Sequence, residues 1–185
     1  MAMEITELML HPIRLRIVNA VFDGQPFTTS QLLQRLPDVP KATMYRHVGV
    51  LVEGGLIEVE GEERKAGAVE RTYRLHPPRT VIDGAAAAAM SKDDHRRGFA
   101  AGMASLLGEF EVYLSRKGAK PTADMVTYRQ ISLWLNDAEK EALYQEFIAA
   151  IRKRLDHTPS ADRRRHLLAM IMFPTQGTRR RDRGR

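Results

Sequence analysis

The sequence predicts a mostly α-helical α+β fold, in which three short helices and a two-stranded hairpin precede a longer helical and α+β part. Apolar residues recur at helical spacing in three early segments, and two runs of alternating residues follow them. His76-Pro77-Pro78 then interrupts the pattern. A chain of 185 residues is long enough for one large domain or two small ones. We therefore expect a first domain over residues 1–77, a second over 78–174 and a basic disordered tail over 175–185.

The first two helices are predicted from the residues at their ends. Pro12 begins the first helix, because a proline costs no hydrogen bond in the first helical turn, and Gly24 supplies the left-handed residue that ends it. Thr28 and Gln31 have the spacing of a capping box, which begins the second helix. The residues expected to be buried are Ile13, Ile17, Ala20 and Val21 in the first helix and Leu32, Leu33 and Leu36 in the second.

A third helix and a hairpin complete the first domain. The third helix covers residues 41–55, with a core stripe of Met44, Val48 and Leu51, and Gly54-Gly55 ends it. The runs 56–60 and 69–75 alternate apolar and polar residues, which is typical of paired antiparallel strands. Residues 61–68 between them are charged and contain glycine, so we expect a long mobile loop there.

The second half mixes helices and strands. The alanine-rich residues 81–90 favour a helix, and Ser91 with Asp94 begins a long helix from Lys92 to Lys117. Residues 125–135 and 165–173 have the composition of strands. Between these two segments, a helix begins at Asn136, with Glu139 at its third position. Its expected buried residues are Leu143, Phe147, Ile151 and Leu155.

Composition excludes several classes of protein. The chain has no cysteine, which excludes disulfides, thiolate metal sites and cysteine nucleophiles. No apolar run approaches ~20 residues, so we expect no membrane span, and the N-terminus lacks the pattern of a secretory signal. The simplest expectation is a cytoplasmic protein. The motifs G-x-S-x-G, H-E-x-x-H, G-x-G-x-x-G and the P-loop are absent, so we expect no enzyme, no cofactor and no metal site.

The charge is unevenly distributed. The net charge is +6, yet residues 1–80 carry ten basic and ten acidic side chains, whereas the final seven residues carry five arginines and one aspartate. Net charge governs non-specific association. An argument for nucleic acid must therefore rest on local pattern.

Three helices followed by a hairpin is the element order of a winged helix-turn-helix, in which the third helix fits the major groove of DNA. The segments LHPIRLRIVNA, PKATMYRHVGVLVEGGLIEV and GAVERTYRL resemble the ArsR-like and PadR-like winged-helix transcriptional regulators of bacteria over residues 8–76. A strand ending in LWLN, a glutamate-rich helix and a strand ending in FP resemble a subgroup with an α/β C-terminal extension. The resemblance implies a dimeric regulator that binds a promoter and usually represses. Without cysteine, a thiolate-based arsenic or zinc sensor is excluded.

The residues expected to bind DNA lie on the third helix and in the hairpin. Thr43 and Arg46 are three apart, hence on one helix face, and they could contact phosphates or base edges. His47 adjoins the core stripe, so we expect it to pack inside. We expect Arg71 to form a salt bridge, and the hairpin glutamates to face away from DNA. The complete set of expected DNA-binding residues is Lys41, Thr43, Tyr45, Arg46, Arg64 and Lys65.

Alternative functions stay open at this point. A winged helix can also serve as a protein–protein adaptor without specific DNA binding, and the zero net charge of residues 1–80 favours that alternative. The C-terminal half could hold an unidentified small-molecule effector, or its aromatic and methionine side chains could be core or dimer interface. The side chains in question are Met125, Tyr128, Trp134, Met170 and Met172.

The long helix carries a continuous apolar seam, spaced by four, three, four and three residues. The seam packs either against strands of its own domain or against a second copy. Two-fold symmetry suits a near-palindromic operator, so we expect a homodimer built mainly on this helix. The seam consists of Phe99, Met103, Leu106, Phe110 and Tyr113.

Overall fold

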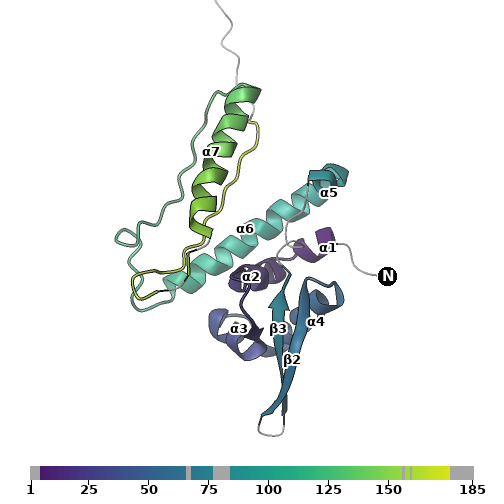
Figure 1. Cartoon of the computed structure of the whole chain (residues 1–185). Helices are drawn as coiled ribbons and strands as arrows, with labels where there is room; N and C mark the ends of the chain where they lie inside the picture. Colours follow the sequence, from purple (N-terminus) through teal and green to yellow (C-terminus); the bar gives the residue numbers. More distant parts are fainter. Residues whose placement is uncertain (1–4, 66–67, 77–83, 156, 159, 176–185) are drawn as a thin grey trace, which may run out of the picture. The chain divides into compact units, whose positions relative to one another are not determined.

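A computed structural model describes residues 5–65, 68–76, 84–155, 157–158 and 160–175 (Figure 1). The chain forms two compact units, residues 1–127 and 128–185. The expected boundary after residue 77 borders a segment outside the described residues, and the three-domain division stays a prediction. The expected tail lies outside them too, except for Thr175.

The first unit begins with four helices, and two of them carry the predicted N-terminal signals. Pro12 is the first residue of its helix, and the side chain of His11 accepts a hydrogen bond from the Ile13 amide at 3.2 Å. Thr28 and Gln31 form the predicted capping box. Gly24 has a φ of +69°, but the predicted helix end at Gly24 is wrong, because the helix already ends at Ala20 with Val21 as its C-cap. The helices are α1 (Ile5–Met9), α2 (Pro12–Ala20), α3 (Thr29–Arg35) and α4 (Lys41–Glu53).

A three-stranded antiparallel sheet lies beside these helices. It contains β1 (Phe27–Thr28), β2 (Ile57–Lys65) and β3 (Ala68–Leu75) in the order β1-β3-β2. The predicted long loop over 61–68 is wrong, because the two strands stay paired up to Lys65 and Ala68. This end of the hairpin is exposed on both sides, so charged side chains replace the apolar alternation that a half-buried strand needs.

The core of the first unit joins α1 to α4 and the sheet. Met44, Val48 and Leu51 are buried as predicted, and so are Leu32 and Leu36, whereas Leu33 is only partly buried. The core residues include Leu8, Ile17, Val18, Ala20, Val21, Phe27, Leu32, Leu36, Val39, Met44, Val48, Leu51, Leu56, Ile57, Tyr73 and Leu75. One face of α4 is thereby fixed, and its other face is available to solvent.

A long helix belongs to the same compact unit. After α5 (Gly84–Ala89), the predicted capping box of Ser91 and Asp94 begins α6 (Lys92–Leu114), which ends three residues before the expected Lys117. Helix α6 packs against α2, and its buried residues are Ala101, Ser105 and Val112. Small side chains at this contact permit close approach of the two helices.

In the described part of the second unit there is one helix, α7 (Asp137–Leu155). The Asn136 side chain accepts a hydrogen bond from the Glu139 amide at 2.9 Å and the Glu139 carboxylate accepts one from the Asn136 amide at 2.8 Å, which confirms the predicted cap. The predicted strands over 125–135 and 165–173 are wrong, because neither segment pairs with another strand in the described chain. The predicted buried face of α7 is wrong for the same reason, because without a sheet to cover it no residue of this helix is buried.

The observed architecture confirms the predicted fold class: helices predominate, and a small sheet ends in a wing-like hairpin. None of the helices among the described residues is both long enough and apolar enough to cross a membrane.

Candidate nucleic-acid interface

Helix α4 presents polar side chains on the face opposite its core stripe. Lys41, Tyr45 and Arg46 are exposed, and Thr43 is half-buried. The ammonium group of Lys41 lies 5.9 Å from the centre of the Tyr45 ring, within range of a cation–π contact. The structure therefore brings the four predicted residues of this helix onto a solvent-accessible surface.

The start of α4 also leaves backbone donors available. Its N-cap is Pro40, which makes no side-chain hydrogen bond to the first turn. The first amide groups of a helix have no partner within the helix, so they and the nearby Lys41 ammonium favour an anion such as a phosphate. This end of α4 has the chemistry of a phosphate contact.

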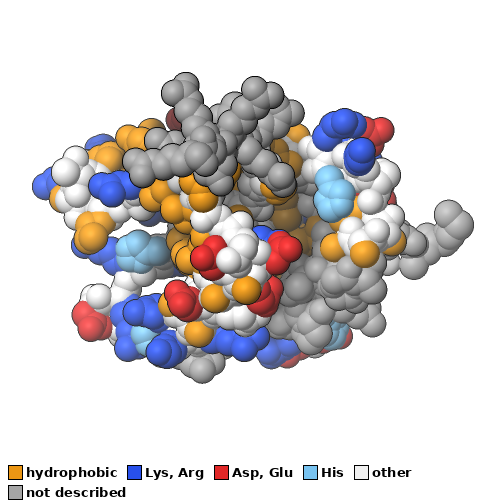
Figure 2. Space-filling model, turned by 90° about the horizontal axis from the view of Figure 1, so that it is seen from above, with side chains coloured by type: hydrophobic (Ala, Val, Ile, Leu, Met, Phe, Trp, Pro, Cys, Tyr) orange, Lys and Arg blue, Asp and Glu red, His pale blue; other side chains and the backbone are white. Residues whose placement is uncertain are grey.

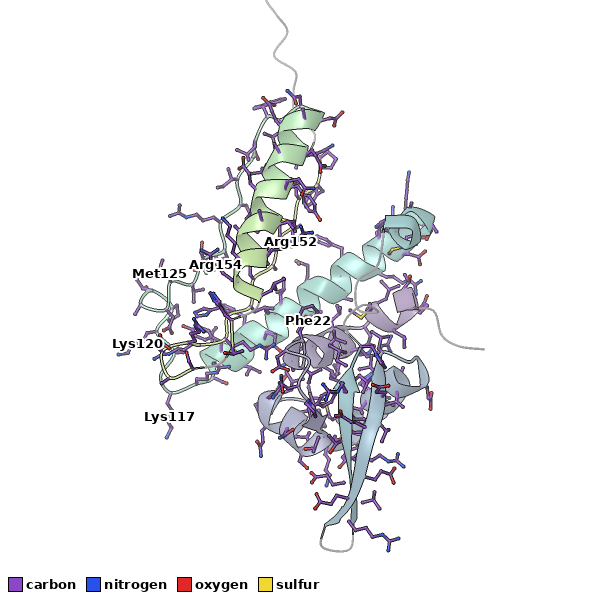
Figure 3. All side chains as sticks on the ribbon, in the orientation of Figure 1. Phe22, Lys117, Lys120, Met125, Arg152 and Arg154 are labelled. Carbon is purple, nitrogen blue, oxygen red and sulfur yellow. The ribbon has the colours of Figure 1, made fainter. Side chains whose placement is uncertain are left out.

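The hairpin of β2 and β3 extends away from the core, and its side chains project from both faces (Figure 3). Near its tip Arg64 is exposed and its backbone pairs with that of Val69. The backbone of Lys65 pairs with Ala68, but the Lys65 side chain lies outside the described part of the structure. Of the two wing residues expected to bind DNA, Arg64 thus has a described side chain, and that side chain is open to solvent.

Two carboxylates of β2 are bound by arginines of β3, and a third lies beside the His76 ring that follows β3. The distances are 2.7 Å from Glu62 to Arg71, 2.6 Å from Glu60 to Arg74 and 2.8 Å from Glu58 to His76. The prediction that Arg71 forms a salt bridge is confirmed, and its hydrogen bond to Glu62 raises the pKa of its guanidinium. Each of these pairs is solvent-exposed, so each contributes little to stability. Their main effect is to cancel charge along the hairpin.

His47 lies beneath the polar face of α4. It is buried, as predicted, and its ring centre is 4.3 Å from that of His11. Burial, followed by the nearby charges of His11, Arg46 and Arg14, lowers the pKa of His47 to about 4. Arg46 Nη2 lies 3.4 Å from His47 Nε2, while His47 Nδ1 has no hydrogen-bond partner among the described residues. At neutral pH His47 is therefore an uncharged support for the Arg46 side chain.

Sequence reasoning missed an ion-pair cluster behind α4. Arg16 is buried and donates to both carboxylate oxygens of Asp38, at 2.6 and 2.7 Å, and to Glu109 Oε1 at 2.9 Å. Arg16 comes from α2, Asp38 from the turn between α3 and α4, and Glu109 from α6. The hydrogen bonds from Arg16 lower the pKa of the Asp38 carboxyl. These contacts fix the turn that precedes the recognition helix to both other helices.

The spacing of Arg16 offered a signal for this cluster. It follows Ile13 by three residues and precedes Ala20 by four, so it shares a helix side with two residues expected to be buried. An arginine on such a side needs a carboxylate partner. The identity of the partners depends on tertiary packing, which helix spacing does not report.

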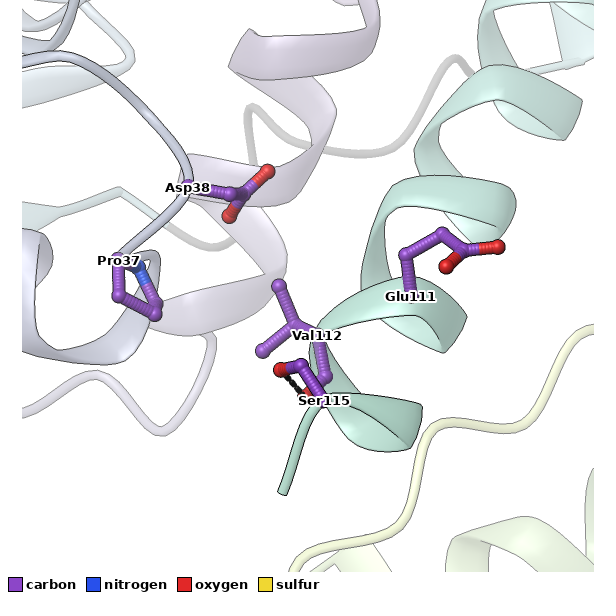
Figure 4. A pocket seen from close by; sticks show the side chains of 5 residues that line it. All are labelled: Pro37, Asp38, Glu111, Val112 and Ser115. Atoms are coloured by element: carbon purple, nitrogen blue, oxygen red, sulfur yellow. Dashed lines mark hydrogen bonds between the residues drawn. The ribbon is translucent and has the colours of Figure 1, made fainter. Parts of the chain in front are cut away.

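An open cleft of about 410 Å³ borders this cluster (Figure 4). Pro37 and Asp38 line it from the turn, and Glu111, Val112 and Ser115 line it from the end of α6. The Ser115 hydroxyl donates to the Val112 carbonyl at 2.8 Å. Since Asp38 is bound by Arg16 and the Ser115 hydroxyl by a backbone carbonyl, the cleft has few polar groups free for a ligand.

The predicted seam on α6 does not coincide with the buried side of that helix. Phe99 is 50% exposed, whereas Met103, Leu106, Phe110 and Tyr113 are half-buried. The Phe110 and Tyr113 rings stack with centres 6.0 Å apart, and the Tyr113 hydroxyl donates to Asp124 at 2.7 Å. Leu107 and Leu114, also exposed, were not expected. The homodimer stays a prediction.

The five side chains considered for an effector site are all exposed. They line neither the cleft of Figure 4 nor the groove formed by Phe147, Ala150, Ile151, Arg154 and Leu168. A small-molecule effector therefore stays a prediction. Among the described residues, no group of three or more His, Asp or Glu side chains could hold a metal ion.

Comparison with known proteins addresses the first unit. Residues 9–60 match a family model described as a helix-turn-helix domain, and the matched segment contains α2, α3, α4 and the first part of β2. No curated protein matches the chain. The match and the geometry of α4 agree, and residues 9–60 of this chain form a helix-turn-helix domain, the type of domain with which regulators bind DNA.

Proposed function

We propose that this protein is a sequence-specific transcriptional regulator of the ArsR- and PadR-like winged-helix type, which binds a near-palindromic operator as a homodimer and represses transcription. The observation that carries the proposal is that α4 has one buried apolar face and one exposed polar face. Its core stripe anchors the helix, and Lys41, Tyr45 and Arg46 on its other side are exposed to solvent, which leaves them available to DNA. Such a regulator acts in the cytoplasm, where its operator lies.

Each residue has a distinct role in this proposal. Arg46 reaches into the major groove, where a guanidinium pairs with the two acceptors of guanine. Thr43 contacts a phosphate or a thymine methyl group. Lys41 and the free amides of the first turn bind the phosphate backbone, with Tyr45 beside them. Arg64 and Lys65 at the wing contact an adjacent phosphate or the minor groove.

The experiment is enrichment of binding sites from a random pool of duplex DNA with the full chain, followed by titration of the enriched site. Arg46→Ala should weaken specific binding by roughly 1–3 kcal/mol, because the arginine's contact to a base is lost. Arg96→Ala is the matched control, because Arg96 is an exposed arginine of α6, outside the helix-turn-helix domain, that pairs with its helix neighbour Asp93. Equal affinities of Arg46→Ala and Arg96→Ala for the site would refute the assignment of Arg46.

The homodimer is proposed to form through the α6 seam. Phe99 is 50% exposed and the other four seam residues are only half-buried, so the seam retains surface that a second copy can cover. Met103→Glu combined with Phe110→Glu should weaken dimerisation by about tenfold or more, measured by sedimentation over a range of micromolar concentrations. A wild type that is monomeric, or a folded double variant that dimerises through α6 as before, would contradict the proposal.

The alternative is a protein–protein adaptor, and one observation favours it. The paired carboxylates and cations of the hairpin leave little net charge to attract DNA. The enrichment experiment separates the two functions, because an adaptor would yield no consensus site.

Deletion of residues 178–185 tests whether the arginine-rich end contacts DNA. If it does, the deletion should lower the affinity for all DNA sequences alike and flatten the dependence of binding on salt concentration.

A further inference from the structure

The second unit exposes an unusual amount of apolar surface. None of its described residues is buried, although α7 is regular and well capped. Fourteen large hydrophobic side chains of this unit are exposed: Tyr128, Ile131, Leu133, Trp134, Leu135, Tyr144, Phe147, Leu155, Leu167, Leu168, Met170, Ile171, Met172 and Phe173. A chain segment with this composition would normally bury most of them.

The exposed area is large enough for a specific interface. Tyr128 is 84% exposed and Trp134 is 76% exposed. An aromatic side chain contributes about 150–250 Å², so these two alone expose roughly 300 Å². The whole set amounts to something on the order of 1,000 Å², compared with the roughly 800 Å² that each partner buries in a stable complex. Hydrophobic side chains also reach the surface in several places in the space-filling view (Figure 2).

The backbone of the two flanking segments is unsatisfied as well. Residues 128–135 and 167–172 lie in no helix, strand or turn, and none of them makes a backbone hydrogen bond to another described residue. Residues 128–135 include Tyr128, Ile131 and Trp134, and residues 167–172 include Ile171, all of residue types that favour a strand. An extended apolar segment with free amide and carbonyl groups is a template for pairing with another strand.

The charges of α7 indicate which partner fits. Its first turn carries Asp137 and Glu139, and its last turn carries Arg152, Lys153 and Arg154. Figure 3 labels Arg152 and Arg154 near that end of the helix. A second α7 related by a two-fold axis perpendicular to the helix runs antiparallel to it, and this orientation brings each acidic end beside a basic end. The surface is thus complementary in charge to itself.

We propose that the second unit completes its fold by strand exchange with a second copy of the chain. In this arrangement residues 128–135 and 167–172 of one copy form β-strands that pair with the same segments of the other, and the exposed side chains fill a shared core against both α7 helices. The two copies would then associate at a surface separate from α6, so this inference goes beyond the function proposed above.

Hydrogen exchange of the full chain tests the inference directly. The measurement is made at a concentration where the protein is a dimer, with twice the chain mass of 21.0 kDa. There the amides of residues 128–135 and 167–172 should exchange at least tenfold more slowly than amides of an unpaired chain, because strand pairing gives them hydrogen-bond acceptors. Trp134 is the only tryptophan of the chain, so its emission should be blue-shifted and poorly quenched by acrylamide at the same concentration. Free exchange of both segments in the dimer would overturn the proposal, and so would protection in a chain of monomeric mass.

Two variants at one position separate pairing from packing. Ile131 is 74% exposed in the single chain, so its replacement should be harmless there. Ile131→Pro removes an amide donor once per copy and should weaken dimerisation about tenfold or more, whereas Ile131→Val keeps the donor and should dimerise as the wild type does. Equal dimerisation of the two variants would overturn the proposal.

The α6 variant keeps the two proposals distinguishable. Met103→Glu with Phe110→Glu leaves both flanking segments intact, so they should stay protected from exchange even if the α6 contact is lost. Loss of protection in this variant would mean that the segments depend on α6, and it would overturn strand exchange as a separate interface. Retained protection with an unchanged mass would support strand exchange and contradict only the α6 dimer.

Discussion

Replacement of Arg16 should loosen the turn that precedes the recognition helix. Arg16 is 5% exposed and binds Asp38 through two hydrogen bonds and Glu109 through one. Arg16→Met keeps most of the aliphatic stem and removes the guanidinium. The variant therefore tests the ion-pair cluster with little loss of packing.

The magnitude follows from the burial of each partner. A hydrogen bond to a charged group contributes about 1.5–3 kcal/mol, and loss of one partner from a fully buried pair costs about 3–5 kcal/mol. Here the Asp38 and Glu109 side chains are 44% and 25% exposed, so water can solvate the carboxylates that Arg16 leaves behind. We expect Arg16→Met to reduce the free energy of unfolding by about 2 kcal/mol. Arg16→Lys should lose somewhat less, because an ammonium cannot bind both oxygens of Asp38 in the planar arrangement of a guanidinium.

Urea denaturation at neutral pH measures this change, and a double-mutant cycle with Asp38→Asn isolates the pair. The pair's contribution should also depend on pH. Because Arg16 lowers the pKa of Asp38 below its ordinary 3.8, the stabilisation is present above about pH 4 and is lost as the pH falls through the lowered pKa. Arg96→Ala serves as the exposed control. Ordinary surface substitutions change the free energy of unfolding by ~0.5 kcal/mol or less. If the free energy of unfolding of Arg16→Met differs from that of the wild type by no more than this, the cluster does not hold the turn in place.

Three further predictions concern α3, α4 and the core. His47 has a pKa of about 4 in the folded chain and about 6.5 in a free chain, so stability should fall as the pH drops from 6.5 to 4; His47→Leu should flatten that slope in denaturation series. Gly54→Ala should lower the stability of the folded chain by about 1–3 kcal/mol in thermal melts, because the new Cβ would lie 2.2 Å from a methyl group of the fully buried Leu8. Gly49→Ala is the control in the same helix, and it should stabilise α4 by up to about 1 kcal/mol because open space surrounds the new Cβ. Thr28→Ala should cost about 1 kcal/mol in urea because the α3 cap is lost, and a cost no greater than that of Ser30→Ala would contradict it.

The local features of the fold could be predicted from the sequence. Capping pairs such as Thr28 with Gln31 and Asn136 with Glu139 act within one helical turn, so their spacing alone identifies them. The core stripe of α4 is equally local. The partners of Arg16 are 22 and 93 residues away and could not be predicted from spacing. The strands predicted around α7 failed for a related reason, because composition gives strand propensity but not the neighbour that a strand requires.

In the candidate site too, the features set by local helix spacing could be predicted and those set by strand pairing could not. The exposed positions of Lys41, Tyr45 and Arg46 follow from helix periodicity around Met44, and the structure has them as expected. The extent of the wing did not follow, because residues 61–65 carry no apolar alternation and their strand is maintained by backbone pairing and by ion pairs such as Glu62 with Arg71. The spacing of apolar residues therefore predicts which positions are buried, but it does not predict a strand pair that is exposed on both faces.

The ion pairs along the hairpin bear on how such a protein would find its site. With Glu60 and Glu62 bound by Arg74 and Arg71, most of the wing offers DNA no net attraction, and residues 1–80 as a whole are electrically balanced. Sliding along random DNA depends on sequence-independent attraction to phosphates. A helix-turn-helix unit with only a few phosphate contacts dissociates quickly from wrong sequences, so its search would proceed by short visits and its base contacts would lengthen its residence time at the operator.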